Sequence, residues 1–420
     1  MSNSAELQTG ARPYVPESAW LRSAKVFTLL VSLVIIVGGV TSGCIYLVVA
    51  MLAPNRVGGS QLNIGVAGIS IFALSLALGG ALLFQAVSAL SRQPSARVQL
   101  PHPMAFVLVF LLAVGVGTLA TWPGGLPWVL FPFFYVLGIA TPIGWVLAVV
   151  NRQLGRAGVS STWRETILHL SSGAFISTST AIVLELLAVV GMILIAAIVA
   201  LVTPGGLEAL EAFSENIQQP GWADSVDNLT GLLSSPPVVI SLFFLMCIVV
   251  PLIEELLKAV GVVLMSWRRP SPVRALWWGL LGGAGFALAE GLFNSNLATG
   301  DMLWGVLAPM RFGTTILHCL TGALMGLGWY GLLFNRRPPQ WLSRYVQAVV
   351  IHALWNALSL GLLFTSPGLP YVSGPATAAS PVGSTLTVLL FFQAVLMVAW
   401  LLLIIHRSAD GRAQKADLQA

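Results

Sequence analysis

The sequence contains very few charged residues for its length. Asp, Glu, Lys and Arg make up 8% of the 420 residues, whereas soluble domains contain about 25%. Together with a hydrophobic content of 57%, this scarcity excludes a water-soluble globular protein and indicates an integral membrane protein. The net charge of +5 is spread over loops, so it indicates orientation in a membrane rather than nucleic-acid binding.

Cysteine is also scarce. The three cysteines, Cys44, Cys247 and Cys319, all lie in apolar stretches. They suggest neither a disulfide framework nor a cysteine-based metal site. A signal-peptide pattern is missing as well, because a polar segment with Pro13 and Pro16 precedes the first long apolar run. We therefore expect that run to be a retained span.

Ten long apolar segments predict ten membrane-spanning helices, since a helix crosses a bilayer with about 20 residues. The segments are 26–52, 63–91, 104–121, 126–150, 180–202, 237–266, 273–297, 302–334, 344–365 and 383–406. Pro251 lies inside the sixth segment and would free a backbone carbonyl there. The predicted fold is all-α, a polytopic transmembrane helix bundle.

The positions of Lys and Arg predict the orientation of this bundle. The basic loops are 92–102, 151–179, 267–274 and 335–344, which fall on one side if ten helices alternate. The positive-inside rule then places both termini in the cytoplasm. The opposite loop at 203–235 is acidic, with Glu208, Glu211, Glu215, Asp224 and Asp227. Loop 151–179 could contain a short interfacial helix or be a plain linker.

Ionisable and amide side chains interrupt four apolar segments near the C-terminal end. They are Glu254, Glu255 and Lys258, then Glu290, then Arg311 and His318, then His352 and Asn356. A charge at the centre of a bilayer costs ~2.5–3.5 kcal/mol, so isolated charges would be hard to retain. At ~1.5 Å per residue, the depths of these groups in their segments overlap. We therefore expect them to meet in a polar chamber built for chemistry or for transport.

The sixth segment carries more acid than its lysine can neutralise. Glu254 and Glu255 lie four and three residues before Lys258, so both can reach it along a helix surface. An internal salt bridge would ease membrane insertion, but it would leave one carboxylate over. A surplus buried carboxylate can serve as a general base.

The remaining polar residues also have simpler interpretations. Glu290 or His318, taken singly, is typical of a hydrogen bond between helices, and Arg311 could extend to the outer interface. Asn356 lies one turn after His352, where it could orient the imidazole or donate to an oxyanion. Glu185 in the fifth segment has no companion nearby, and we interpret it as a structural hydrogen bond to another helix.

In their order, these motifs resemble those of PrsW-type intramembrane proteases, which are related to the CAAX prenyl endoproteases and the bacterial CPBP proteins. The motifs are Glu254-Glu255-x-x-Lys258, Phe286-x-x-x-Glu290, His318 on the next helix, and His352-x-x-x-Asn356. The resemblance covers about 236–366. Lys258 and Glu290 fit the PrsW branch, whereas Asn356 is closer to the CAAX branch, since the PrsW pattern often has Asp there.

The resemblance implies hydrolysis of peptide bonds in membrane-anchored protein substrates, in regulated signalling at a bacterial plasma membrane. The implied partners are the lipid bilayer and that substrate, with no nucleic acid. The chain then divides into a cytoplasmic tail 1–25, about five helices in 26–202, the acidic extracytoplasmic loop 203–235, a catalytic membrane core 236–366, a loop and last helix in 367–406, and a cytoplasmic tail 407–420.

Two versions of the chemistry follow from the resemblance. In the first, which needs no cofactor, Glu254 activates water, Glu255 pairs with Lys258, and the two glutamates could exchange roles. His318, His352 and Asn356 would supply donors or a proton. In the second, one divalent zinc lies on Glu290, His318 and His352, a known type of catalytic set. We favour the first, because no H-E-x-x-H helix is present and the wider group is mostly viewed as metal-free glutamate proteases.

Two other classes of function remain open at this point. A proton- or ion-coupled transporter also buries Glu, His, Lys and Arg, but the chain shows no inverted repeat between its halves. A catalytically inactive membrane scaffold could keep the polar chamber for binding alone.

Overall fold

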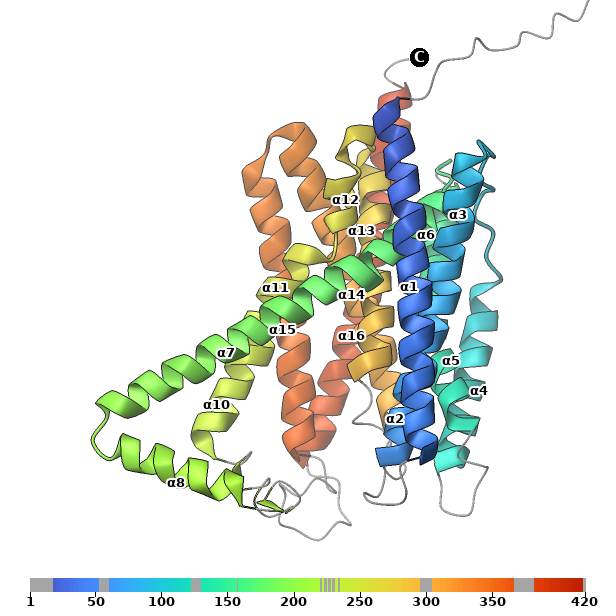
Figure 1. Cartoon of the computed structure of the whole chain (residues 1–420). Helices are drawn as coiled ribbons and strands as arrows, with labels where there is room; N and C mark the ends of the chain where they lie inside the picture. Colours follow the sequence, from blue (N-terminus) through green and yellow to red (C-terminus); the bar gives the residue numbers. More distant parts are fainter. Residues whose placement is uncertain are drawn as a thin grey trace, which may run out of the picture.

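The computed structural model describes most of the chain as a helical bundle (Figure 1). The described residues are 18–52, 60–121, 130–156, 158–219, 221–222, 225, 228, 231–232, 235–294, 304–365 and 381–417. Most of the predicted N-terminal tail and the predicted loop at 367–380 lie outside them. Within the described residues, the structure is helical apart from turns and an isolated β-bridge between Arg97 and Thr162.

The helices confirm the predicted all-α fold. The first eight are α1 (Ala19–Leu52), α2 (Ser60–Leu74), α3 (Gly80–Leu90), α4 (Pro103–Thr121), α5 (Phe131–Arg156), α6 (Trp163–Ser171), α7 (Thr178–Val202) and α8 (Gly206–Gln218). They are followed by α10 (Pro236–Phe244), α11 (Val250–Leu257), α12 (Val260–Leu264), α13 (Pro272–Asn294), α14 (Trp304–Asn335), α15 (Pro338–Thr365) and α16 (Pro381–Asp417). Counting consecutive helices as one where they join, ten helical segments among the described residues are long and apolar enough to span a membrane, as predicted.

The largest departure from the predicted spans is the fifth, which is much longer than expected. The segment predicted as loop 151–179 contains α6, and a π-helical turn at Ser172–Ser177 joins α6 to α7 without a break. Thr162 caps α6 by accepting a hydrogen bond from the Glu165 amide at 3.4 Å. The Glu165 carboxylate in turn binds the Trp278 indole. Two polar residues of the segment predicted as a loop thus have structural roles: Thr162 caps α6, and Glu165 connects α6 to Trp278 of α13.

The predicted acidic loop also contains a helix. Glu208, Glu211 and Glu215 all lie on α8, which directly follows α7. Asp224 and Asp227 lie outside the described residues. At the other end of the chain, α1 begins at Ala19, inside the predicted N-terminal tail.

The centre of the bundle is a close contact between α13 and α14. These two spans are the most buried of the ten: 83% of the residues in the most apolar stretch of α13 and 78% of those in α14 lie inside the molecule. A Cβ on Gly283 would lie 1.9 Å from the His318 carbonyl oxygen, and one on Gly322 would lie 2.4 Å from the Gly279 carbonyl oxygen. Because no side chain fits there, glycines allow the two backbones to touch. This contact fixes Glu290 of α13 relative to His318 of α14.

The sixth span is broken into α10, a π-helical turn at Leu245–Val249, α11 and α12. In this turn the Val250 amide donates to the carbonyl of Leu245, five residues earlier. The next carbonyl in that pattern belongs to Met246, and its donor would be Pro251, which has no N–H. Asn356 of α15 fills the gap, because its Nδ2 donates to the Met246 oxygen at 2.7 Å. The predicted free carbonyl is thus present and satisfied.

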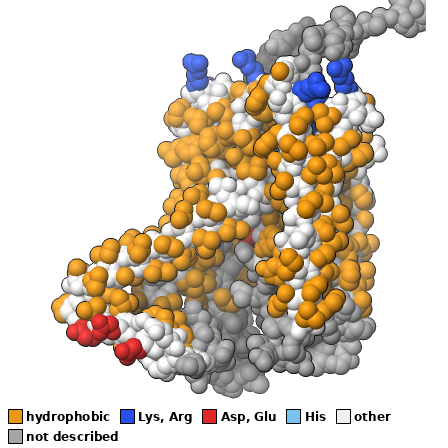
Figure 2. Space-filling view, in the orientation of Figure 1, with side chains coloured by type: hydrophobic (Ala, Val, Ile, Leu, Met, Phe, Trp, Pro, Cys, Tyr) orange, Lys and Arg blue, Asp and Glu red, His pale blue; other side chains and the backbone are white. Residues whose placement is uncertain are grey.

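Helices α7, α8 and α10 form an arm that extends from the bundle, here called the α7–α10 arm (Figure 1). Of its described residues, only Thr178 and Ala181 are buried, both at the start of α7. Figure 2 shows hydrophobic side chains over the middle of the molecule. It also shows Lys and Arg at one end and acidic side chains near the tip of the arm. This distribution is typical of a protein that crosses a bilayer.

Candidate active site

Four neighbouring helices bring together six of the predicted site residues. Glu254 and Glu255 come from α11, Lys258 from the position that ends α11, Glu290 from α13, His318 from α14 and His352 from α15. The side chains of Lys258 and Glu255 are fully buried, and those of His318 and His352 are 1% and 4% exposed. The predicted polar chamber is therefore present in the structure.

Glu255 is held by two partners. Its Oε1 lies 2.5 Å from Lys258 Nζ and 2.7 Å from His352 Nδ1. Lys258 Nζ also lies 3.3 Å from His352 Nδ1. The expected pairing of Glu255 with Lys258 is present, and Glu255 also orients the imidazole of His352. A carboxylate engaged in this way is a poor candidate for activating water.

Glu254 is the surplus carboxylate. Its Oε2 lies 3.1 Å from Lys258 Nζ, 3.8 Å from His352 Nδ1 and 4.0 Å from His318 Nδ1. No hydrogen-bond donor among the described residues is aligned with this buried oxygen. Glu254 therefore lies at the centre of the cluster with an oxygen that can accept a proton.

Glu290 joins His318 to Arg311. Its Oε2 lies 2.6 Å from His318 Nε2, and its Oε1 accepts a hydrogen bond from Arg311 Nη1 at 3.2 Å. The interpretation in which Arg311 extends to the outer interface is therefore wrong. Within the bundle a carboxylate needs a charged partner, and Arg311 provides one from the facing helix.

Asn356 does not contribute to this cluster as expected. Its side-chain amide binds the Met246 carbonyl, so it is not directed at His352. The orienting partner of His352 is Glu255 instead. The spacing of His352 and Asn356 on one helix face was misleading. Pro251 leaves the Met246 carbonyl without a backbone donor, and the side-chain amide of Asn356 supplies one.

A sequence profile of the PrsW family of intramembrane metalloproteases matches residues 161–399, which is more than half of the chain. This protein belongs to the PrsW family. It is therefore an integral, multi-pass membrane protein from a family of membrane proteases. The match begins near α6 and ends in α16, so the similarity to PrsW proteases extends well beyond the predicted 236–366. No curated protein and no solved structure matched the chain.

The PrsW match also includes Glu185 on α7, which the sequence analysis interpreted as a structural hydrogen bond. At Glu185 Oε1 that interpretation has no support, because this oxygen is buried and has no hydrogen-bond partner among the described residues. Glu185 instead interacts electrostatically with Glu290, Lys258 and Glu254. The sequence signal that could have assigned Glu185 to the cluster is its position as an ionisable residue inside an otherwise apolar span.

The donor atoms of the cluster fit a metal ion of the kind that the PrsW family name implies. Two groups of three residues place one potential ligand atom each within 4.8 Å of one another: Glu254, Glu290 and His318, and Glu254, Glu255 and His352. Glu254 belongs to both groups. His318 Nδ1 and Glu254 Oε2 are buried without an aligned hydrogen-bond partner in the described part of the chain, as open ligand positions would be. The predicted trio of Glu290, His318 and His352 is not one of these groups.

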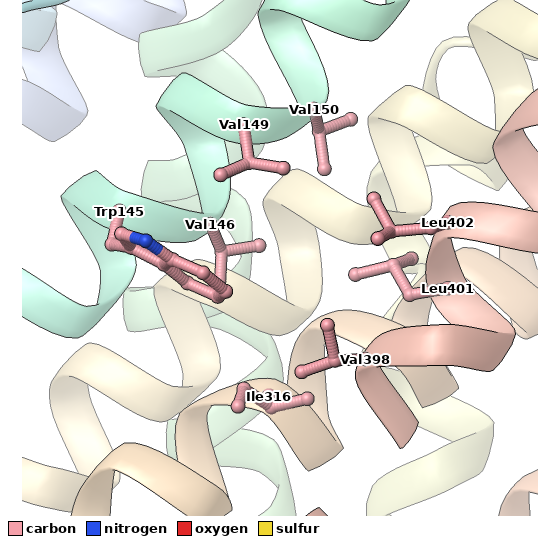
Figure 3. A pocket seen from close by; sticks show the side chains of 8 residues that line it. All are labelled: Trp145, Val146, Val149, Val150, Ile316, Val398, Leu401 and Leu402. Carbon is pink, nitrogen blue, oxygen red and sulfur yellow. The ribbon is translucent and has the colours of Figure 1, made fainter. Parts of the chain in front are cut away.

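A small crevice between α5, α14 and α16 is unrelated to this chemistry. Figure 3 shows hydrophobic side chains around it, including Trp145, Ile316 and Leu401. Its volume of about 10 Å³ barely admits one water molecule. The crevice offers no polar group for a reaction, so the candidate site is the charged cluster.

Proposed function

We propose that this protein hydrolyses a peptide bond in membrane-anchored protein substrates, within or beside the bilayer, as part of regulated signalling. The observation that carries the proposal is the position of Glu254. Its Oε2 lies among Lys258, His318 and His352, while the charge of the neighbouring Glu255 is already balanced. Membership of the PrsW family favours this function over transport.

In the proposed reaction Glu254 takes a proton from water as the water oxygen bonds to the carbonyl carbon of the substrate. His352 donates its Nδ1–H to Glu255, so its Nε2–H, present in the imidazolium form, is the donor for the developing oxyanion. When the C–N bond breaks, the proton taken by Glu254 passes to the leaving amine. His318 is placed to relay it, because its Nδ1 faces Glu254 at 4.0 Å.

Lys258, Glu255 and Glu290 position these groups. Lys258 neutralises part of the negative charge beside Glu254, and Glu255 fixes the ring of His352. Glu290 fixes the ring of His318 and is itself held by Arg311. If a zinc ion is bound, Glu254, Glu290 and His318 would hold it, and it would lower the pKa of a bound water and polarise the carbonyl.

We also propose that the protein lies in a bacterial plasma membrane with both termini in the cytoplasm. The support is the separation of charge visible in Figure 2, with Lys and Arg at one end of the molecule. The acidic helix α8 would then lie on the extracytoplasmic side.

The function is tested with a tagged single-span test protein whose span of about 20 Leu and Ala residues contains a central Gly-Pro break. We expect the wild type to cleave it in proteoliposomes and Glu254→Gln to lose at least ~10²-fold in rate, because the amide cannot take the proton. Glu215→Gln on the exposed face of α8 is the matched control and should cleave normally. Cleavage by Glu254→Gln at the wild-type rate, or none by the wild type, would contradict the proposal.

A further inference from the structure

The charged cluster is closed on one side and accessible on the other. The side chains of Glu255 and Lys258 are fully buried. Those of Glu290 and Arg311 are 18% and 20% exposed. A substrate must therefore approach from the side where Glu290 and Arg311 lie.

Helix α7 passes this accessible side. At its start, Ser177 Oγ donates a hydrogen bond to the Leu257 carbonyl at 2.9 Å, which holds α7 against the end of α11. Ala181 follows one turn later and is 1% exposed. Glu185 follows one turn after that, on the same face. This places Glu185 beside the cluster, in agreement with its electrostatic interaction with Glu290 and Lys258.

Glu185 is the last polar side chain of α7 before the helix leaves the bundle. From Leu186 to Val202 the helix has no buried residue. On the other side of the α7–α10 arm, α10 also has no buried residue among its described residues. Its side chains Ile240 and Phe244 are 68% and 48% exposed. Figure 1 shows α7 and α10 diverging from the bundle towards α8. Two apolar helices therefore flank the approach to the accessible side.

We propose that a single membrane segment of the substrate enters laterally along α7 and α10, and that Glu185 binds its backbone next to the scissile bond. This inference rests on the proposed peptidase function. The apolar side chains of the arm match a membrane segment, and the route is continuous with the accessible edge of the cluster. A protease must unwind a helix to reach a peptide bond, and each N–H released inside the bilayer then needs an acceptor. The unpartnered Oε1 of Glu185 is such an acceptor.

The route is tested by photocrosslinking in the inactive Glu254→Gln background, with the same single-span test protein as the probe. A benzophenone amino acid replaces Ile240 or Phe244 on α10. The matched control replaces Leu108, which is 62% exposed on α4. We expect adducts with the test protein from both α10 positions and at least ~10-fold fewer from α4. Equal adducts from α4, adducts only with a second copy of this chain, or none from α10 would overturn the route.

The role of Glu185 is tested by steady-state kinetics of otherwise wild-type protein. Removing a hydrogen bond to a charged acceptor should raise KM about tenfold in Glu185→Ala, with a smaller change in kcat. Glu185→Gln keeps an acceptor oxygen and should recover part of the loss. Leu108→Ala, at an exposed position on α4 away from the proposed route, should match the wild type. A fall in kcat alone, or no change in Glu185→Ala, would overturn the assignment.

These outcomes separate the two proposals. If the wild type cleaves and the adducts come from elsewhere, the lateral route fails and the peptidase function stands. If the wild type does not cleave but the α10 adducts form, the route describes binding alone and the proposed peptidase function fails.

Discussion

At the scale of single residues, the cluster is organised by charge balance. Among the described residues, Glu254, Glu255 and Glu290 have two Lys or Arg partners within contact distance, Lys258 and Arg311. Glu255 and Glu290 each have a cation and an imidazole within 3.3 Å, whereas Glu254 has the most distant set of partners. This asymmetry assigns the chemistry to Glu254 and positioning to the other two acids.

Removing the charge of Lys258 should destabilise the fold. In Lys258→Met, the carboxylate of Glu255 stays buried without its cation, which costs about 3–5 kcal/mol when a buried pair is broken. We expect a clearly lower thermal midpoint in detergent. The double variant Glu255→Gln with Lys258→Met should recover much of the lost thermal stability, because the unpaired charge of Glu255 is then removed. If the single variant unfolds like the wild type, the buried pair contributes little.

Metal content separates the two versions of the chemistry. In the version favoured here, chelator treatment leaves cleavage unchanged and the purified protein carries well under one zinc per chain. Elemental analysis of the wild type and of His318→Ala checks this directly, without relying on activity. Near-stoichiometric zinc in the wild type that is lost in His318→Ala would support instead a metal held by Glu254, Glu290 and His318.

At the scale of helices, close packing of α13 on α14 sets the distance between Glu290 and His318. A Cβ at Gly283 would meet the His318 carbonyl at 1.9 Å, so Gly283→Ala should force the helices apart. We expect lower stability together with loss of cleavage. Gly115→Ala on α4 is the control, because no neighbouring side chain or helix would lie within 4 Å of the added Cβ. It should be neutral or slightly stabilising, since Ala favours helix. Equal effects of the two changes would contradict this packing argument.

The π-helical turn between α10 and α11 depends on Asn356. In Asn356→Ala the Met246 carbonyl loses its donor, at a cost of about 1–3 kcal/mol for an unsatisfied buried group. We expect reduced thermal stability with cleavage lowered far less than in Glu254→Gln. If the variant keeps its full stability and loses all activity, Asn356 belongs to the chemistry after all.

At the scale of the whole molecule, the ten candidate spans among the described residues favour the proposed arrangement with both termini on one side of the membrane. We expect a fluorescent protein fused after residue 420 to be fluorescent in bacterial cells, as a cytoplasmic tag would be. In a variant without Cys44, Cys247 and Cys319, a cysteine replacing Ser214 on α8 should react with a membrane-impermeant maleimide from outside. A dark tag, or a Ser214→Cys variant labelled only from inside, would reverse the proposed orientation.

Composition predicted the membrane class, and the pattern of hydropathy along the chain predicted the number of candidate spans, because hydropathy is a sum over neighbouring residues. The spacing of Glu254, Glu255 and Lys258 also predicted their contact, since a helix places positions three and four apart side by side. A short helix in 151–179 was one of two alternatives, but its continuation into the fifth span was not predicted, because its polar residues cap the helix and bind Trp278 rather than water.

The sequence by itself determined that polar groups on separate helices had to meet, because the bilayer offers them no other partner. Only the tertiary structure decided which of them meet. It paired Arg311 with Glu290, turned Asn356 to Met246 and brought Glu185 of α7 beside the cluster. These choices depend on helix crossings set by glycine contacts and a π-helical turn, which join residues far apart in the chain.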